Sequence, residues 1–401
     1  MSKLKTAACR AFQAGLKIGN YFLGYRIPEV IKGAGYVLTL PKIIKEKGIH
    51  HVFVVTDEGL MKLGLVDPLL QAMDEAELKY TLFSDIRPNP TDEDAEKGYH
   101  LFWRDEYEAI VAFGGGSPMD CAKAIAAKNA HPHRKVASLQ GILKVHKKIV
   151  PFWAIPTTAG TGSETTVAAV ITEAKTKHKA SISDPVLMPR TAVLDPELTK
   201  GLPPFITATT GMDALCHAVE AYTNWTYLTK LEKKLAKEAV RLIHDNLLKA
   251  YRDGSDLAAR MNMQVAAFDA GRAFTRGCVG YVHAIGHTLG GLYGVPHGLA
   301  MSVILPHVLK AYGAAVYPHL AELADICGIG GADEKEKAEA FIAWIEEMNE
   351  QMGIPKGFDM IREKDIPQII RWADAEANPL YPVPVVWERK DFDTLIRKLQ
   401  I

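Results

Sequence analysis

Three histidines, His283, His287 and His297, lie close together in a stretch of small and apolar residues. His283 and His287 are four residues apart, so a helix would place them on one face. The glycines and the proline that follow can turn the chain and bring His297 back towards the same place. A single histidine here would be an ordinary core or helix-end residue, but three converging imidazoles indicate a metal site or a proton relay.

A second pair of potential ligands lies upstream. Asp213 and His217 are also four residues apart, so a carboxylate and an imidazole on one helical face can share a metal ion. The alternative is an exposed pair on a helix surface, but the flanking residues are apolar, which argues for burial. One carboxylate and imidazoles without a thiolate favour Fe²⁺, Mn²⁺ or Zn²⁺ over Cu⁺ or an iron–sulfur cluster.

Two glycine-rich or threonine-rich loops each follow a predicted strand. Gly114-Gly115-Gly116-Ser117 stands between a strand and a helix, where bare backbone N–H groups can bind a phosphate. Many α/β proteins turn this way without a ligand, and the G-x-G-x-x-G fingerprint is absent. However, the loop Thr157 to Ser163 follows another strand, and two such loops at carboxyl ends of parallel strands predict a nucleotide crevice.

Asp57 ends the first strongly apolar strand and has two readings. Its carboxylate can accept hydrogen bonds from a ribose 2′-OH and would repel a 2′-phosphate, which predicts NAD rather than NADP. It can equally serve as the N-cap of the helix that follows Thr56. The sequence leaves both readings open.

The order of elements predicts an α/β domain followed by a helical one. Strands alternate with helices up to about Leu202, which predicts a doubly wound parallel sheet, and the remainder shows helical periodicity only. We therefore expect a dinucleotide-binding domain over residues 1–202 and an all-helical metal and substrate domain over 203–401. The expected strands are 51–55, 80–83, 107–113, 149–155 and 191–194, and the expected helices are 65–76, 118–127, 208–223, 228–251, 257–274, 299–312 and 335–352, with one more at the C-terminus.

Residues 1–25 form an N-terminal extension that is basic and contains no acid. Such a start resembles a transit peptide, but we favour a surface helix that lies on the body or on a partner subunit. The 401 residues have a formal net charge of zero, which argues against a nucleic-acid-binding surface. The 5 cysteines are scattered without a C-x-x-C pair, so we expect a reducing, cytoplasmic location. No apolar run approaches the roughly 20 residues of a membrane span.

The chain resembles the iron-containing (group III) alcohol dehydrogenases of the dehydroquinate synthase-like superfamily from about Tyr25 onwards. The resemblance rests on the ordered motifs Gly114 to Asp120, Pro156 to Thr161, Gly211 to Ala221 and Val282 to Gly298. It implies Asp213, His217, His283 and His297 as metal ligands, His287 near the substrate and nicotinamide, and Phe274 at the substrate pocket. It also implies a dimer or larger homo-oligomer. The implied cofactor contacts are Asp57, Asn89, Gly115, Gly116, Ser117, Asp120, Thr157, Thr158, Thr161, Thr166 and Lys179.

The function expected from these residues is hydride transfer between NAD(H) and a small primary alcohol or aldehyde, with Fe²⁺ or alternatively Zn²⁺. His287 is the candidate proton relay. The alternatives are a glycerol or diol dehydrogenase, or a cyclising lyase of the same superfamily. A lyase needs several basic residues for its phosphorylated substrate, and the largely apolar pocket stretch speaks against it. A non-catalytic NAD-binding protein would be expected to lose ligands, and all four are present. Thr275-Arg276-Gly277-Cys278 departs from the family's usual residues, so the identity of the substrate stays open.

Overall fold

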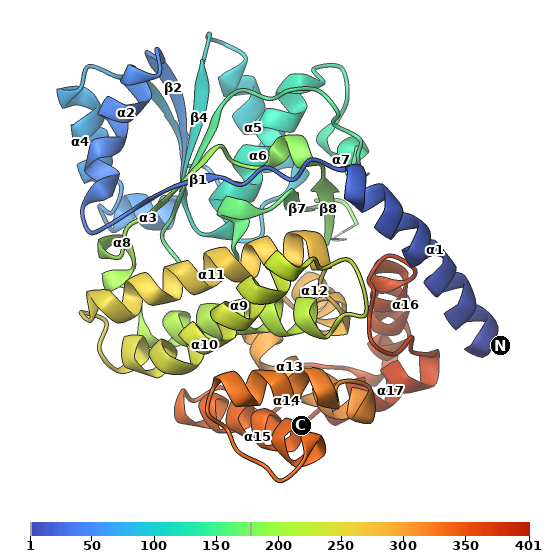
Figure 1. Ribbon diagram of the computed structural model, residues 1–401. Helices are drawn as coiled ribbons and strands as arrows, with labels where there is room; N and C mark the ends of the chain where they lie inside the picture. The colour runs from blue at the N-terminus through green and yellow to red at the C-terminus, as the bar shows by residue number, and fades with distance from the viewer. Residues whose placement is uncertain (1, 177–178) are drawn as a thin grey trace. The chain divides into compact units, whose positions relative to one another are not determined.

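The computed structural model describes residues 2–176 and 179–401 (Figure 1). The chain divides into an α/β unit, Gly24–Leu202 with Ser255–Gln264, and a helical unit, Met1–Leu23, Pro203–Gly254 and Val265–Ile401. This division differs from the single boundary expected after residue 202 in two places. The N-terminal segment groups with the helical unit, and the first part of helix α11 (Leu257–Gly277) groups with the α/β unit.

A six-stranded sheet forms the centre of the α/β unit. The strands run in the order β1-β9-β6-β4-β2-β3, and every pairing in this sheet is parallel. The doubly wound parallel sheet predicted from the sequence is therefore confirmed. The strands are β1 (Glu29–Lys32), β2 (His51–Val55), β3 (Lys79–Phe83), β4 (Ala109–Gly114), β6 (Phe152–Pro156) and β9 (Thr191–Leu194).

Helices cover both faces of this sheet because its central strands are apolar on both sides (Figure 1). In β2, Val52 and Val54 face the layer of α2 (Leu40–Glu46) and α4 (Asp67–Glu75). Phe53 and Val55, which alternate with them, face the layer of α5 (Asp92–Phe102) and α6 (Gly116–Ala130). The short helices α3 (Glu58–Lys62), α7 (Val136–Leu139) and α8 (Glu197–Lys200) complete the unit.

Several strands were missing from the sequence prediction. The edge strand β1 was not expected, and neither was a second sheet of β5 (Gly141–Ile142), β8 (Lys179–Ser183) and β7 (Ala168–Thr172), in that order. β7 and β8 pair antiparallel. These strands are only partly buried, so they lack the continuous apolar run that identified β2, β4 and β6.

The helical unit contains no strand longer than an isolated bridge among the residues that the structure describes. The expected helices are present with ends shifted by a few residues, whereas α14 and α16 were not anticipated. The helices are α1 (Ser2–Phe22), α9 (Pro204–Thr223), α10 (Lys230–Arg252), α11, α12 (Tyr281–Tyr293), α13 (His297–Tyr312), α14 (Tyr317–Ile326), α15 (Glu334–Gln351), α16 (Ile366–Ala377) and α17 (Arg389–Lys398).

Helix α1 lies on the chain's own C-terminal segments (Figure 1). Lys5 Nζ lies 2.7 Å from an Asp374 carboxylate oxygen. The buried Gln13 amide donates to the carbonyls of Pro379 and Tyr381 and accepts a hydrogen bond from the Trp225 indole N–H. These contacts are those of a surface helix on the body of the protein, the interpretation favoured from the sequence.

One helical stretch, His297–Ala315, is long and apolar enough to cross a membrane by length and composition alone. No such run was expected from the sequence. Of this stretch, 56% is buried inside the chain, as in the core helix of a soluble protein, so it is weak evidence for a span.

Candidate active site

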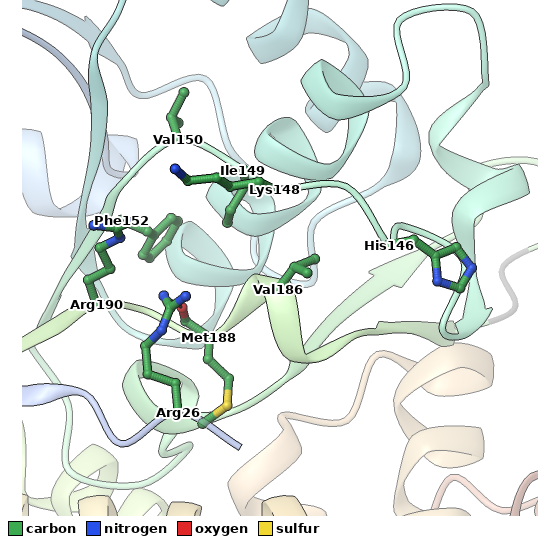
Figure 2. A pocket seen from close by; sticks show the side chains of 9 residues that line it. All are labelled: Arg26, His146, Lys148, Ile149, Val150, Phe152, Val186, Met188 and Arg190. Carbon is green, nitrogen blue, oxygen red and sulfur yellow. Dashed lines mark hydrogen bonds between the residues drawn. The ribbon is translucent and has the colours of Figure 1, made fainter. Parts of the chain in front are cut away.

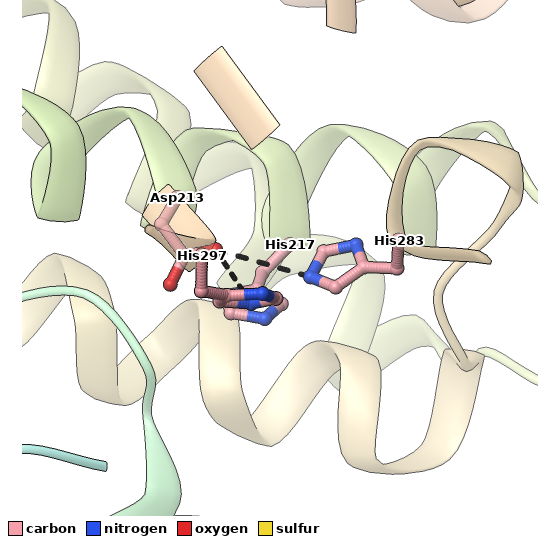
Figure 3. A group of neighbouring side chains, drawn as sticks. All are labelled: Asp213, His217, His283 and His297. Carbon is pink, nitrogen blue, oxygen red and sulfur yellow. Dashed lines mark ion pairs between the residues drawn. The ribbon is translucent and has the colours of Figure 1, made fainter. Parts of the chain in front are cut away.

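Four side chains from three helices of the helical unit converge on one point (Figure 3). Asp213 and His217 come from α9, His283 from α12, and His297 from the first residue of α13. One oxygen of Asp213 and one ring nitrogen of each histidine all lie within 4.8 Å of one another. Asp213, His217 and His283 are buried, and the His297 side chain is 25% exposed. These are the four residues that the sequence predicted as metal ligands.

The chemistry of these four groups fits a divalent metal ion. Asp213 Oδ1 lies 3.4 Å from His297 Nε2 and 3.9 Å from His283 Nε2. Among the described residues, neither Asp213 Oδ1 nor His283 Nε2 has a hydrogen-bond partner, although both atoms are buried. Buried polar atoms are normally satisfied, so two such atoms that face the same point indicate a place where a ligand can bind. One carboxylate and three imidazoles suit Fe²⁺ or Zn²⁺.

Glu220 holds His283 in the orientation that a metal ligand needs. The buried carboxylate of Glu220 lies 2.6 Å from His283 Nδ1 and accepts a 2.8 Å hydrogen bond from the Val282 N–H. A proton on Nδ1 leaves the lone pair on Nε2, which points towards Asp213. Burial raises the pKa of Glu220 to about 8 and lowers the pKa of His283 well below its usual range, and a bound cation would favour the carboxylate and the neutral imidazole.

Sequence reasoning assigned Glu220 no role, although a signal was present. Asp213, His217 and Glu220 are spaced by four and then three residues on α9, which puts them on one helical face. Cys216 Sγ also approaches His283 Nδ1, at 3.9 Å. Burial raises the pKa of this thiol well above its usual value, so it remains protonated and is a poor metal ligand.

Two glycines let the ligand-bearing helices approach closely. A Cβ at Gly298 would lie 2.5 Å from the Thr209 carbonyl oxygen on α9. A Cβ at Gly286 on α12 would collide with the Met301 side chain on α13. Residues with side chains at these positions would push the helices apart and move His297 away from Asp213.

His287 lies beside these four residues, and its ring contacts both His297 and Glu376. Its ring stacks on His297 with centroids 5.2 Å apart, and its Nδ1 lies 2.7 Å from Glu376 Oε1 on α16. The same Glu376 oxygen accepts a 3.0 Å hydrogen bond from the Tyr381 hydroxyl. Burial raises the pKa of Tyr381 well above its usual value, so this phenol stays protonated. The sequence indicated neither Glu376 nor Tyr381.

Phe274 stacks on the His217 ring with centroids 4.1 Å apart and planes inclined by 14°. The phenyl ring of α11 therefore fixes the plane of one candidate ligand. Arg276, two residues further on, donates a 3.2 Å hydrogen bond to the Asn20 carbonyl of α1. The Arg276 side chain, which had left the identity of the substrate undecided, is therefore bound to α1.

In the α/β unit, the two loops expected to bind a nucleotide lie against each other. A Cβ at Gly115 would lie 3.3 Å from Thr158 Oγ1, and a Cβ at Gly116 would lie 2.9 Å from the Thr161 side chain. Gly116 begins α6, which spans 15 residues, so the unpaired N–H groups of its first turn face this place. The glycines are therefore required both for the contact between the loops and for an open helix N-terminus.

Other candidate cofactor residues also lie together. The Asn89 backbone N–H donates to Ser117 Oγ at 3.3 Å, and Lys179 Nζ donates to Asn89 Oδ1 at 3.0 Å. Asn89 has a left-handed backbone with φ of 56°. Asp57 lies at the end of β2 and caps α3, since its carboxylate accepts a 3.0 Å hydrogen bond from the Leu60 N–H. The interpretation of Asp57 as a helix N-cap is thus confirmed.

Asp120, Thr157 and Thr166 are less accessible than expected of cofactor contacts. Thr157 and Thr166 are buried, and the Asp120 carboxylate accepts from Ser163 Oγ at 2.7 Å and from the Val170 N–H at 3.1 Å. The fully buried Lys123 ammonium binds the carbonyls of Ser163, Thr166 and Ala168 and the Thr166 hydroxyl. Lys123 was not predicted from the sequence as a functional residue. Together with Asp120, it holds the second loop in place.

Comparisons with known proteins agree with this geometry. The family model described as "Iron-containing alcohol dehydrogenase" matches residues 28–196, and its C-terminal counterpart matches residues 207–399. The chain belongs to the iron-containing alcohol dehydrogenase family. It is 38% identical over 351 residues to the NAD-dependent methanol dehydrogenase of Bacillus methanolicus, covering 86% of this chain and 91% of that protein.

Solved structures of this family have the same fold. A 1,3-propanediol oxidoreductase is 35% identical with a TM-score of 0.89, covering 94% of this chain and 100% of that one. The sulfoacetaldehyde reductase of Bifidobacterium kashiwanohense in complex with NAD⁺ is 30% identical with a TM-score of 0.82, covering 94% and 98%. The chain is thus an iron-containing oxidoreductase that interconverts alcohols and aldehydes with NAD(H).

Proposed function

We propose that Asp213, His217, His283 and His297 hold the iron ion of this alcohol dehydrogenase, and that His287 exchanges the substrate proton. The observation that carries this proposal is the convergence of four ligand atoms, two of them buried and without a hydrogen-bond partner among the described residues. When bound, Fe²⁺ supplies Lewis-acid polarisation of the substrate oxygen, and the nicotinamide supplies the hydride chemistry.

The chain's own residues orient the ligands and move the proton. Glu220 keeps the proton of His283 on Nδ1, and Phe274 fixes the plane of the His217 ring. Glu376 accepts a hydrogen bond from the proton on His287 Nδ1, so His287 Nε2 remains the atom that takes the proton from an alcohol or returns it to an aldehyde. The Tyr381 hydroxyl donates to the same Glu376 oxygen and holds this carboxylate in place.

We propose that the cofactor binds along the carboxyl ends of the strands in the α/β unit. The α6 N-terminus with Gly115, Gly116 and Ser117 would bind the pyrophosphate, and Asp57 at the end of β2 would bind the adenosine ribose. Asp57 caps α3 through one carboxylate oxygen, Oδ1, so capping and ribose binding are compatible. The remaining candidates line this edge or support it: Asn89, Asp120, Thr157, Thr158, Thr161, Thr166 and Lys179.

The substrate that these residues favour is a small, uncharged primary alcohol or the matching aldehyde. Phe274 places an apolar ring beside the ligand His217, and Arg276 is engaged with α1. The methanol and propanediol enzymes named among the relatives act on molecules of this size. A diol dehydrogenase of the same family is the second candidate, and it rests on the propanediol relatives.

We also propose that the enzyme is a cytoplasmic homodimer or a larger homo-oligomer. All five cysteines are free, which suits a reducing compartment. Helix α1 exposes Leu4, Ile18, Tyr21 and Phe22 by 66% to 79%, and an apolar surface of this kind suits a subunit contact.

The proposal is tested with the metal-free protein reloaded with Fe²⁺ and assayed by NADH absorbance over a panel of small aldehydes. His283→Ala and His297→Ala should lose both iron and activity, whereas His287→Ala should keep its iron and lose rate, chiefly in its pH dependence. Full iron occupancy in His297→Ala would overturn the ligand assignment. Equal iron loss in His283→Ala and His287→Ala would overturn the separate role of His287.

A further inference from the structure

A pocket of about 200 Å³ lies in the α/β unit, away from the loops described above (Figure 2). Its lining comes from the residues just before three neighbouring strands: Arg26 before β1, Arg190 before β9, and Lys148 with its neighbours before β6. The pocket therefore lies at the amino edge of the parallel sheet. The glycine-rich and threonine-rich loops follow the carboxyl ends of β4 and β6, at the opposite edge of the same sheet.

The lining of this pocket is cationic. Figure 2 shows the charged ends of Arg26, Arg190 and Lys148 on three sides of the Phe152 ring, with His146 further away. None of the described residues that line it is acidic. Within residues 2–176 and 179–401, none of these three cations forms an ion pair. Arg26 Nη1 donates a long hydrogen bond of 3.3 Å to the Met188 carbonyl.

The two guanidinium groups are close enough to repel each other. Burial lowers the pKa of Arg26, and the positive charge of Arg190 lowers it further. A second pocket of about 620 Å³ shares both arginines. The one carboxylate among the lining residues that the structure describes, Glu29, is already paired with Lys47 at 3.0 Å. Like charges held together without a counter-charge are unfavourable, and an anion between them would reverse the sign of the interaction.

We propose that this pocket, at the amino edge of the sheet, is a binding site for a phosphate group, either as free phosphate or as the phosphomonoester of a small metabolite. Two planar guanidinium forks and one ammonium match the oxygens of a tetrahedral dianion. The pocket has several times the roughly 30 Å³ that one water occupies, so a phosphate fits. The adjoining second pocket offers space for the organic part of a phosphomonoester.

The proposal is tested by calorimetric titration of the enzyme with inorganic phosphate at constant ionic strength, adjusted with NaCl. Saturating NADH is present throughout, so that phosphate cannot occupy the cofactor loops. We expect one saturable site per chain, and at least a tenfold weaker site in the double variant Arg26→Gln/Arg190→Gln. The matched control is Arg104→Gln, an exposed arginine of the same unit, which should bind as the unchanged protein does.

The same titration with glycerol 3-phosphate separates the two sources. Tighter binding than inorganic phosphate identifies a phosphomonoester site, and equal or weaker binding identifies a site for free phosphate. The double variant removes two like charges, so its melting temperature without phosphate should be unchanged or higher, which excludes misfolding as the cause. No saturable binding, or equal affinity in the double variant, would overturn the proposal. The proposal would also be overturned if the unchanged protein bound no phosphate and the double variant changed its oligomeric state. That result would show that acidic side chains of a second copy fill the pocket.

Discussion

Replacing Glu220 with glutamine should weaken iron binding while leaving the fold intact. The carboxylate now accepts from both the Val282 N–H at 2.8 Å and His283 Nδ1 at 2.6 Å. A glutamine of the same shape has one accepting oxygen and one donating NH₂ group. If the oxygen stays on Val282, the NH₂ group faces His283 Nδ1 and favours the tautomer that carries its proton on Nε2, the atom that must bind iron.

The size of this effect follows from the buried position of the pair. Both side chains are about 3% exposed, so solvent cannot replace the lost hydrogen bond. Removing a partner that orients a metal-bound histidine typically costs about 10–100-fold in metal affinity, or about 1.4–2.7 kcal/mol. We therefore expect the iron dissociation constant of Glu220→Gln, measured by competition with a chromogenic chelator, to rise by that factor.

The matched control is Glu322→Gln, a carboxylate on α14 of the same unit that contacts Tyr222 and Lys237 but none of the four ligands. Its iron affinity should not change. Melting temperatures of the two metal-free variants show whether either has lost its fold. An iron affinity of Glu220→Gln within twofold of the unchanged protein would refute the argument that Glu220 sets the tautomer of His283.

Three further substitutions test other parts of the account. Burial raises the pKa of Glu164 from 4.5 to about 7, so the folded state holds this proton more tightly than the unfolded state does. Glu164 therefore lowers the stability of the fold increasingly as pH rises from about 4.5 to 7. Glu164→Gln should therefore be more stable than the unchanged protein by up to about 3 kcal/mol at pH 8, but not at pH 4.5, in denaturant titrations; equal stability at both pH values would contradict this. Gly298→Ala should lose about 1–3 kcal/mol of stability together with iron, because its Cβ would meet the Thr209 carbonyl, whereas Gly15→Ala in α1, with nothing within 4 Å, should lose neither. Asp57→Ser keeps a helix cap but removes the charge, so KM for NADPH should fall while the melting temperature holds; an unchanged ratio of NADH to NADPH use would make Asp57 a cap only.

The parts of the fold that the sequence predicted are those with one dominant signal. β2, β4, β6 and β9 are apolar runs with nearly every residue buried, and α9 and α13 carry long apolar patterns. β1 was not predicted because three of its four residues are exposed, so it lacks an apolar run. The region after β2 was expected to hold one helix over 65–76, but it holds α3 and α4, because Asp57 caps a separate short helix.

The candidate metal ligands could be predicted because two of them share α9 and the others lie in one histidine-rich stretch. The contact of Glu376 with His287 could not be predicted, since the two residues are 89 positions apart and meet only through the packing of α16 on α12. Lys123 looks in the sequence like an ordinary solvated lysine. Only the fold shows that β7 and the loop before it surround this ammonium with carbonyl oxygens.

The central claim is that one iron ion binds to Asp213, His217, His283 and His297, with His287 outside the ligand set. A crystal of the iron-loaded enzyme, measured with X-rays on either side of the iron absorption edge, tests it most directly. We expect one anomalous peak per chain, at about 2.0–2.2 Å from Asp213 Oδ1 and from a ring nitrogen of each of the three histidines. A peak elsewhere in the chain, or one at bonding distance from His287 in place of any of the four, would contradict the claim.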